Sequence, residues 1–146
     1  MSFIEVKNVK FRYPQTKKDA LGGIELSIEK GEYVSVIGHN GSGKSTLARL
    51  MNGLLLPTEG EVLVDGFSTA DKQKLFEIRK RVGVVFQNPD NQLVASIVED
   101  DVAFGPENIG VPRKEIGERI DFALKAVGME EYRKSTPSRL SWGQKQ

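Results

Sequence analysis

The sequence contains no cysteine, a single histidine, a single tryptophan and no long uninterrupted apolar run. The lack of cysteine excludes disulfide bonds and thiolate metal sites and favours a reducing compartment. No window approaches the roughly 18 apolar residues that a membrane-spanning helix needs. The 146 residues include 21 basic and 20 acidic side chains, and the formal net charge is +1. This near balance gives no electrostatic support for binding nucleic acid.

The beginning of the chain is unlike a targeting segment. Ile4 and Val6 alternate with Glu5 and Lys7, whereas a secretory signal peptide has a continuous apolar core. Together with the lack of an apolar span, this pattern predicts a soluble or peripheral protein of the cytoplasm. The length is sufficient for one domain with its own core.

What the sequence does contain is a glycine-rich run that matches the phosphate-binding pattern G-x-x-x-x-G-K-[ST]. In this pattern the glycines allow a tight turn whose backbone N–H groups point at a phosphate. Lys44 is expected to reach the β- and γ-phosphates, and the Ser45 hydroxyl is expected to bind Mg²⁺. The expected nucleotide-binding residues of the run are Gly38, His39, Asn40, Gly41, Ser42, Gly43, Lys44, Ser45 and Thr46.

The residues around this run favour a phosphate site over a structural glycine turn. The apolar and β-branched run at residues 32–37 predicts a buried strand before the loop. After the loop, Leu47, Leu50, Met51 and Leu54 recur at helical spacing, and Gly53 is placed to end that helix. A strand, a glycine loop and a helix N-terminus together concentrate positive potential on an anion. The sequence therefore predicts that the chain binds a nucleoside triphosphate.

The rest of the first part of the chain also predicts strands. Residues 4–7 and 24–29 alternate between apolar and polar side chains, which is typical of half-buried antiparallel strands. Residues 61–66 predict a further strand, residues 71–81 a helix, and residues 82–86 a buried strand that ends at Gln87. We expect a nucleotide-binding core at residues 1–87.

Beyond Gln87 the sequence predicts a helical subdomain at residues 88–146. Its clearest helix begins at Pro112 and ends at Gly128. The apolar stripe of this helix comprises Ile116, Ile120, Ala123, Leu124 and Val127. A parallel sheet around the phosphate-loop strand needs more strands than the two candidates at residues 33–37 and 82–86. As a nucleotide-binding domain the sequence is therefore expected to be incomplete.

Five features occur in order: Tyr13, the glycine loop, Gln87 at a strand end, a helical stretch, and Leu-Ser-Trp-Gly-Gln at residues 140–144. In this order the chain resembles, over its whole length, the ATP-binding subunits of ABC transporters. Within that family it is most similar to the ATPase subunits of energy-coupling-factor importers for vitamins or for cobalt and nickel. The cues are Phe-Gln-Asn-Pro-Asp-Asn-Gln at residues 86–92 and Asp-Asp-Val-Ala-Phe-Gly-Pro-Glu-Asn at residues 100–108. The resemblance implies an α/β phosphate-loop ATPase with an antiparallel N-terminal β-subdomain and a helical subdomain.

The resemblance also implies roles for residues outside the loop. Tyr13 would stack on adenine, although an aromatic side chain here could instead cover a sheet edge. Gln87 would bind Mg²⁺ or the attacking water, and the alternative is an ordinary polar start of a loop. Ser141, Gly143 and Gln144 would bind the ATP of a second ATPase subunit. Ser141 could also cap its own helix, with Gln144 completing a capping box.

The sequence departs from the family pattern in two respects. Trp142 stands where the family has the first of two glycines in its signature motif. An indole that points away from the phosphate would be tolerated in the second half-site, whereas one that points inward would block closure. The apolar strand that ends in Asp-Glu and the switch histidine do not occur in the 146 residues, and His39 occupies only a variable loop position. Asp65 and the pair Asp100 and Asp101 are expected to be solvated turn and loop acids that cannot replace the missing base.

The expected function is that of an ATPase subunit, with Lys44 and Gln87 as catalytic residues and ATP and Mg²⁺ as ligands. Its expected partners are a second ATPase subunit, identical or different, and a transmembrane coupling subunit at the inner face of the cell membrane. No nucleic-acid partner is expected. The chain alone is expected to bind Mg-ATP without turnover. The alternatives are a non-catalytic nucleotide-binding fragment and a soluble ABC-type ATPase of repair or translation.

Overall fold

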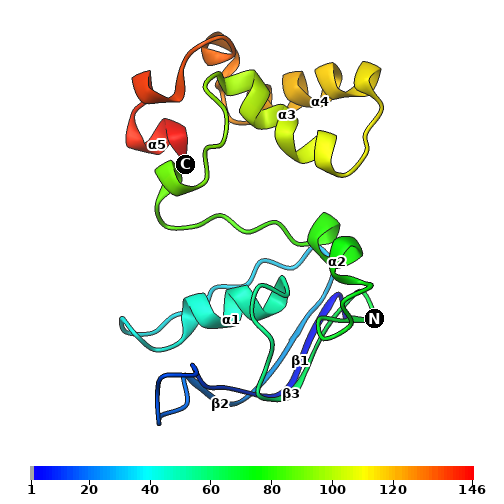
Figure 1. The fold of residues 1–146 in the computed structure, drawn as a ribbon, viewed down its shortest axis with the longest axis vertical. Helices are drawn as coiled ribbons and strands as arrows, with labels where there is room; N and C mark the ends of the chain where they lie inside the picture. Colours follow the sequence, from blue (N-terminus) through cyan, green and yellow to red (C-terminus); the bar gives the residue numbers. More distant parts are fainter. Residues whose placement is uncertain (1) are drawn as a thin grey trace. The chain divides into compact units, whose positions relative to one another are not determined.

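The computed structural model describes residues 2–146, and the chain separates into two compact units, Met1–Val84 and Val85–Gln146. The first unit contains one sheet and two helices (Figure 1). Its strands are β1 (Ile4–Phe11), β2 (Leu21–Ile28), β3 (Glu59–Val64) and β4 (Phe67–Ser68), in the order β2-β1-β3-β4. Its helices are α1 (Lys44–Met51) and α2 (Leu75–Arg81).

The sheet is antiparallel throughout, which confirms the prediction for the N-terminal strands. Val6 on β1 lies opposite Leu26 on β2 and Val62 on β3. The register shifts after Lys7, where Asn8 has a φ of 46°. Gly60 faces this irregularity, and a Cβ on Gly60 would lie only 2.3 Å from the Asn8 carbonyl oxygen. The bulge therefore depends on a glycine at the start of β3.

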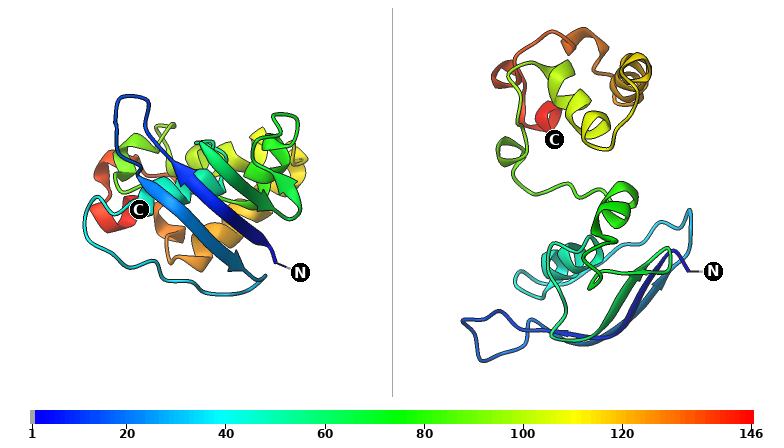
Figure 2. Two further views of the ribbon diagram at one scale, coloured as in Figure 1. Left: turned by 90° about the horizontal axis from the view of Figure 1, so that it is seen from below. Right: turned by 45° about the vertical axis from the view of Figure 1, so that its right-hand side comes forward.

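Both helices lie on one side of the sheet and bury its apolar face (Figures 1 and 2). Leu50 of α1 and Ile78 of α2 are completely buried against the strand residues Val6, Val62 and Val64. The helix predicted after the glycine loop is confirmed, with Gly53 just beyond its end at a φ of 70°. The helix predicted at residues 71–81 begins later, at Leu75.

The two buried strands predicted at residues 32–37 and 82–86 are wrong. Neither segment is paired with a strand anywhere in residues 2–146. Tyr33 and Ile37 are each 94% exposed, and Val85 is 70% exposed. Backbone hydrogen bonds of a strand come from its neighbours, so an apolar run without a neighbouring strand does not form a ladder.

The second unit contains only helices and loops in its described residues. Its longest helices are α3 (Val98–Asn108) and α4 (Arg113–Ala126), and α5 (Trp142–Lys145) lies near its end. The 3₁₀ helix η1 (Pro89–Asn91) precedes α3, and the 3₁₀ helices η2 (Glu130–Tyr132) and η3 (Pro137–Arg139) lie between α4 and α5. The helix predicted after Pro112 is confirmed as α4, with Ile120 and Leu124 buried. Val127, the last residue of the predicted apolar stripe, is exposed.

The core of this second unit joins α3 to α4 and to the segment before α5. It comprises Val98, Ala103, Ile120, Leu124, Met129 and Leu140. In residues 2–146 no helix has both the length and the apolar character required to cross a bilayer.

Candidate nucleotide-binding site

The glycine loop has a left-handed backbone at two positions, and this conformation strongly favours glycine. Gly41 has a φ of 83° and Gly43 a φ of 93°, both in the left-handed region. A Cβ on Gly43 would also lie 2.6 Å from Leu21 Cδ2 and 2.7 Å from the Ala20 carbonyl oxygen. The loop is thus packed against the start of β2, and larger residues at Gly43 would displace it.

The backbone donors at the start of α1 are free. In the described part of the chain, no oxygen accepts a hydrogen bond from the N–H of Lys44, Ser45 or Thr46, and Gly43 provides no side-chain cap. The first bond of the helix is from Leu47 N–H to the Gly43 carbonyl oxygen, at 2.9 Å. Free N–H groups at the positive end of a helix form an anion-binding site.

The Lys44 ammonium lies across the loop. Its Nζ donates to the carbonyl oxygens of Gly38 at 2.7 Å and His39 at 2.8 Å, and to Ser42 Oγ at 3.4 Å. These bonds use all three donors of an ammonium group. The charge is therefore held over the loop, and a phosphate would replace one or more of these acceptors.

Tyr13 is brought together with the loop. Its hydroxyl lies 3.0 Å from Thr46 Oγ1 in the first turn of α1, and its ring meets the Phe11 ring edge-on at a centroid distance of 4.8 Å. A shallow depression of about 460 Å³ adjoins it, lined by Tyr13, Pro14, Gln15 and Thr16. Tyr13 thus lies beside the glycine loop, and its stacking on adenine stays a prediction.

Few side chains near the glycine loop could bind Mg²⁺. No cluster of three or more histidine or acidic residues suited to a metal occurs in residues 2–146. Ser45 is exposed, and its hydroxyl has no hydrogen-bond partner in that part of the chain. Mg²⁺ commonly keeps several waters and takes most of its remaining ligands from phosphates. A single free hydroxyl beside the phosphate loop fits this mode of binding.

The remaining predicted site residues belong to the second unit. Gln87 is exposed, and no hydrogen bond of its side chain occurs within residues 2–146. Ser141 and Gln144 form the capping box: Gln144 N–H donates to Ser141 Oγ at 3.3 Å, and Ser141 N–H donates to Gln144 Oε1 at 2.9 Å. Trp142 is 58% exposed, and Gly143 has open space where a Cβ would be. The capping function is therefore observed, and an additional phosphate contact stays a prediction.

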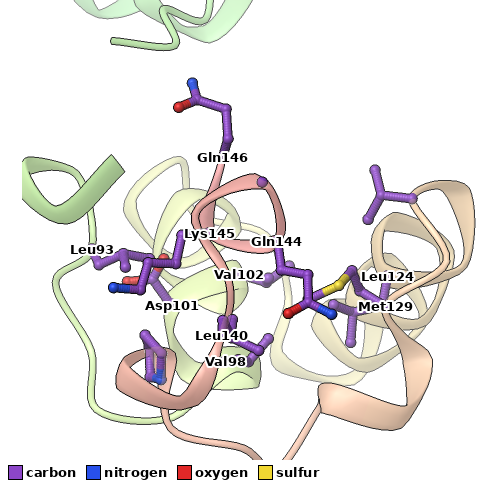
Figure 3. Close-up of a pocket in the computed structure, with 13 residues that line it drawn as sticks. Leu93, Val98, Asp101, Val102, Leu124, Met129, Leu140, Gln144, Lys145 and Gln146 are labelled. Carbon is purple, nitrogen blue, oxygen red and sulfur yellow. The ribbon is translucent and has the colours of Figure 1, made fainter. Parts of the chain in front are cut away.

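A cavity of about 380 Å³ lies in the second unit (Figure 3). Helices α3, α4 and α5 all contribute to its walls. Its apolar wall residues include Leu93, Val98, Val102, Leu124, Met129 and Leu140.

Two of the acidic residues considered as substitutes for a catalytic base, Asp65 and Asp101, have structural partners. Asp65 Oδ2 accepts from Arg81 Nε at 3.0 Å. Asp101 Oδ1 accepts from the N–H groups of Val94 and Ala95, at 2.7 and 3.0 Å. Asp100 and Asp101 lie in the first turn of α3, so the expectation that they are loop acids is wrong. Their negative charges suit the positive end of that helix.

Sequence reasoning assigned no individual role to Gln92, Asp90 and Lys145. Gln92 bonds to the backbone of Phe86, and Lys145 of α5 pairs with Asp90. Gln92 and Asp90 belong to the run at residues 86–92, whereas Lys145 lies far beyond it, and no signal in the sequence indicated the bonds that these residues make.

The glycine loop, the lysine held across it and the helix that follows are the features of a phosphate-loop fold. Residues 21–146 match the ABC transporter family. The chain therefore belongs to the ABC transporter family.

Relatives within this family carry a more specific description. The chain is 56% identical over 149 residues to the energy-coupling factor transporter ATP-binding protein EcfA1 of Clostridium perfringens. This match covers 99% of the chain and 53% of the relative, so the chain spans about half the length of that protein. The resemblance to energy-coupling-factor ATPases is thereby confirmed.

Solved structures agree on the fold. The chain resembles cbiO1 of Clostridium perfringens, part of the ABC transporter complex cbiONQ, with a TM-score of 0.86 and 38% identity. That match covers 99% of the chain and 57% of cbiO1. It also resembles an ATP-binding cassette in a dimeric post-hydrolysis state bound to ADP and Pi, with a TM-score of 0.82 and 32% identity. The second match covers 97% of the chain and 65% of that cassette.

Proposed function

We propose that this chain forms the N-terminal part of the ATP-binding subunit of an energy-coupling-factor importer. The observation that supports nucleotide binding is the set of free N–H groups at Lys44, Ser45 and Thr46, together with the Lys44 ammonium over the same loop. These groups are donors only, and together they form a positive, preorganised cradle for the phosphates of ATP. The similarity to EcfA1 favours transport over repair or translation.

Each site residue has a proposed role. Lys44 binds the β- and γ-phosphates, and Tyr13 stacks on adenine while its hydroxyl remains near Thr46. Ser45 and Gln87 would hold Mg²⁺. When bound, Mg²⁺ neutralises charge on the phosphate oxygens and helps to orient the attacking water.

The second half of the proposal concerns assembly. Ser141, Gly143 and Gln144 would face the nucleotide of a second ATPase subunit, and the helical subdomain at residues 88–146 would contact a transmembrane coupling subunit. Such an assembly would work at the inner face of the cell membrane. ATP that binds the closed pair of subunits better than the open pair shifts the equilibrium towards closure.

For the 146 residues by themselves we propose nucleotide binding without turnover. No apolar strand ending in two adjacent acids occurs in them, and Asp65 and Asp101 are engaged in other bonds. A group to orient water and complete the metal shell is therefore lacking, so attack on the γ-phosphate would be very slow.

The test is calorimetric titration with Mg-ATP, combined with phosphate release on the same sample. Replacing Lys44→Ala should weaken binding about 10- to 100-fold, because it removes a charged donor to the phosphates. Lys72→Ala is the matched control, since Lys72 is exposed and far from the loop in sequence. Binding that does not depend on Lys44 would contradict the phosphate site, and Lys44-dependent release of phosphate would contradict the lack of turnover.

A further inference from the structure

The backbone on both sides of Gln87 is held by one side chain. Phe86 N–H donates to Gln92 Oε1 at 3.0 Å, and Gln92 Nε2 donates to the Phe86 carbonyl oxygen at 3.0 Å and to that of Asn88 at 3.3 Å. The Gln92 carboxamide thus accepts from the Phe86 N–H and donates to the Phe86 carbonyl oxygen. Two residues of a hydrogen-bonded pair in an antiparallel ladder exchange the same two bonds. Phe86 and Asn88 flank Gln87, so the backbone is restrained there, while the Gln87 side chain makes no hydrogen bond within residues 2–146.

The turn that carries Gln92 is itself fixed. Asn88 Oδ1 accepts from Asp90 N–H at 3.0 Å and caps η1, in which Pro89 is completely buried. Gln92 N–H donates to the Pro89 carbonyl oxygen at 2.9 Å. The carboxamide of Gln92 is therefore presented to Phe86 from a rigid turn.

The segment that begins at Ser141 is connected to the same turn. Lys145 Nζ of α5 pairs with Asp90 Oδ1 at 2.8 Å, and the Lys145 side chain is only 17% exposed. Gln146 Nε2 donates to the Phe86 carbonyl oxygen at 3.0 Å, so this oxygen accepts from two amides. The loop of Gln87 and the end of α5 thus share one hydrogen-bonded network.

We propose that Gln92 is a positioning residue for Gln87. The inference rests on the proposed role of Gln87 towards Mg²⁺. A ligand side chain whose backbone is already restrained loses less freedom when it binds, and partners of this kind tune metal affinity. If Gln92 only satisfied the backbone of a loop, its loss would loosen the loop without changing the response to Mg²⁺.

The test uses the ratio of ATP dissociation constants measured by calorimetry without and with Mg²⁺. Gln92→Met keeps the length of the side chain and removes both hydrogen-bonding groups. Gln87→Ala defines the full contribution of Gln87. We expect Gln92→Met to lower the ratio about tenfold, as Gln87→Ala does, and the double variant to lower it no further.

The matched control is Asn91→Ala in the same turn. The Asn91 side chain is exposed and makes no hydrogen bond within residues 2–146, so the ratio should stay at the value of the unaltered chain. The exchange rate of the Phe86 amide provides a readout that needs no nucleotide. It should rise about tenfold in Gln92→Met, while the amides of α4 keep their rates.

The outcomes separate this inference from the proposed function. A ratio lowered by Gln87→Ala but not by Gln92→Met would overturn the positioning role and leave the proposed function intact. Additive effects in the double variant, or an unchanged exchange rate at Phe86, would also overturn it. A Gln87→Ala variant with an unchanged ratio would remove the metal role on which the inference rests. ATP binding that is indifferent to Lys44→Ala would instead overturn the proposed function itself.

Discussion

At the scale of single residues, the ring and the hydroxyl of Tyr13 make separate contributions. The hydroxyl contacts Thr46, whereas the proposed contact with adenine uses the face of the ring. Tyr13→Phe should therefore change ATP affinity by no more than about twofold, and Tyr13→Ala should reduce it by about 2- to 10-fold. Calorimetric titration of both variants measures the difference. Equal losses in the two variants would show that the hydroxyl, and not the ring, matters for binding.

Two glycines of similar backbone conformation allow two costs of an added Cβ to be compared: the cost of a steric clash and the cost of a left-handed backbone. Gly60 and Gly66 have φ values of 80° and 79°, but a Cβ on Gly60 would lie 2.3 Å from the Asn8 carbonyl oxygen, whereas Gly66 has open space. Gly66→Ala should cost about 1–2 kcal/mol of unfolding free energy because of its left-handed conformation. Gly60→Ala should cost about 1–3 kcal/mol more, because the backbone of β1 must shift. Urea unfolding of both variants measures this difference, and equal losses would argue against the close approach of β1 and β3.

At the scale of elements, an ionic network fastens the start of α3 to the segment after η2. Arg133 Nε donates to Glu99 Oε2 at 2.7 Å, and Arg133 also contacts Asp121 while Lys134 contacts Glu99. The Arg133 guanidinium and the Lys134 ammonium hold the pKa of Glu99 below its ordinary value of 4.5. A carboxyl group with a lowered pKa stabilises the fold above the pKa of the unfolded chain, and this stability is lost as the pH falls through the folded value.

The prediction from this network is a change in how stability depends on pH. The unfolding temperature of the unaltered chain should fall as the pH drops below about 4.5, and Glu99→Gln should lack part of that fall. The comparison between the two proteins is essential, because Glu77 and Asp19 also have lowered pKa values through their arginine partners. Thermal unfolding followed by circular dichroism over about pH 3 to 6 measures both curves. Parallel curves would show that the pair with Arg133 contributes nothing to stability.

Elements with a local sequence pattern could be predicted, and elements that need distant partners could not. The alternation at Ile4 and Val6 predicted β1, and the spacing of Leu47 and Leu50 predicted α1. Both patterns arise because one face of the strand or helix is buried in the core. Residues 32–37 have the composition of a buried strand, yet a ladder requires a neighbour that residues 2–146 do not supply. Helix α3 was not located, because Gly105 and Pro106 interrupt its pattern.

The candidate site divides in the same way. The glycine loop was predictable because its conformation is set by residues next to one another in sequence, such as Gly43 and Lys44. The contact of Tyr13 with Thr46 spans 33 residues and was not predicted, because the family resemblance implied only that Tyr13 stacks on adenine. The bonds of Gln92 to Phe86 were not predicted, because a glutamine side chain can bond to many backbone groups and no spacing rule selects one.

At the scale of the whole molecule, large apolar side chains lie exposed in the segments that form no strand. Tyr33 and Ile37 are each 94% exposed, whereas Ile78 is completely buried. Exposed apolar clusters of this kind favour contacts between molecules, since association removes their surface from water. The chain should therefore self-associate with increasing concentration, and the two exposed residues should contribute to association and hardly to folding.

The corresponding experiment replaces an exposed and a buried isoleucine by the same polar residue. Ile37→Ser should reduce self-association in light scattering over a concentration series and change the unfolding free energy by no more than about 0.5 kcal/mol. Ile78→Ser should instead destabilise the chain by about 2–5 kcal/mol, because it removes buried apolar volume and leaves a hydroxyl in the core. A large loss of stability in Ile37→Ser would mean that residues 33–37 are buried in solution. Strand pairing of that segment, for instance between two copies of the chain, would then account for its apolar sequence better than an exposed segment does.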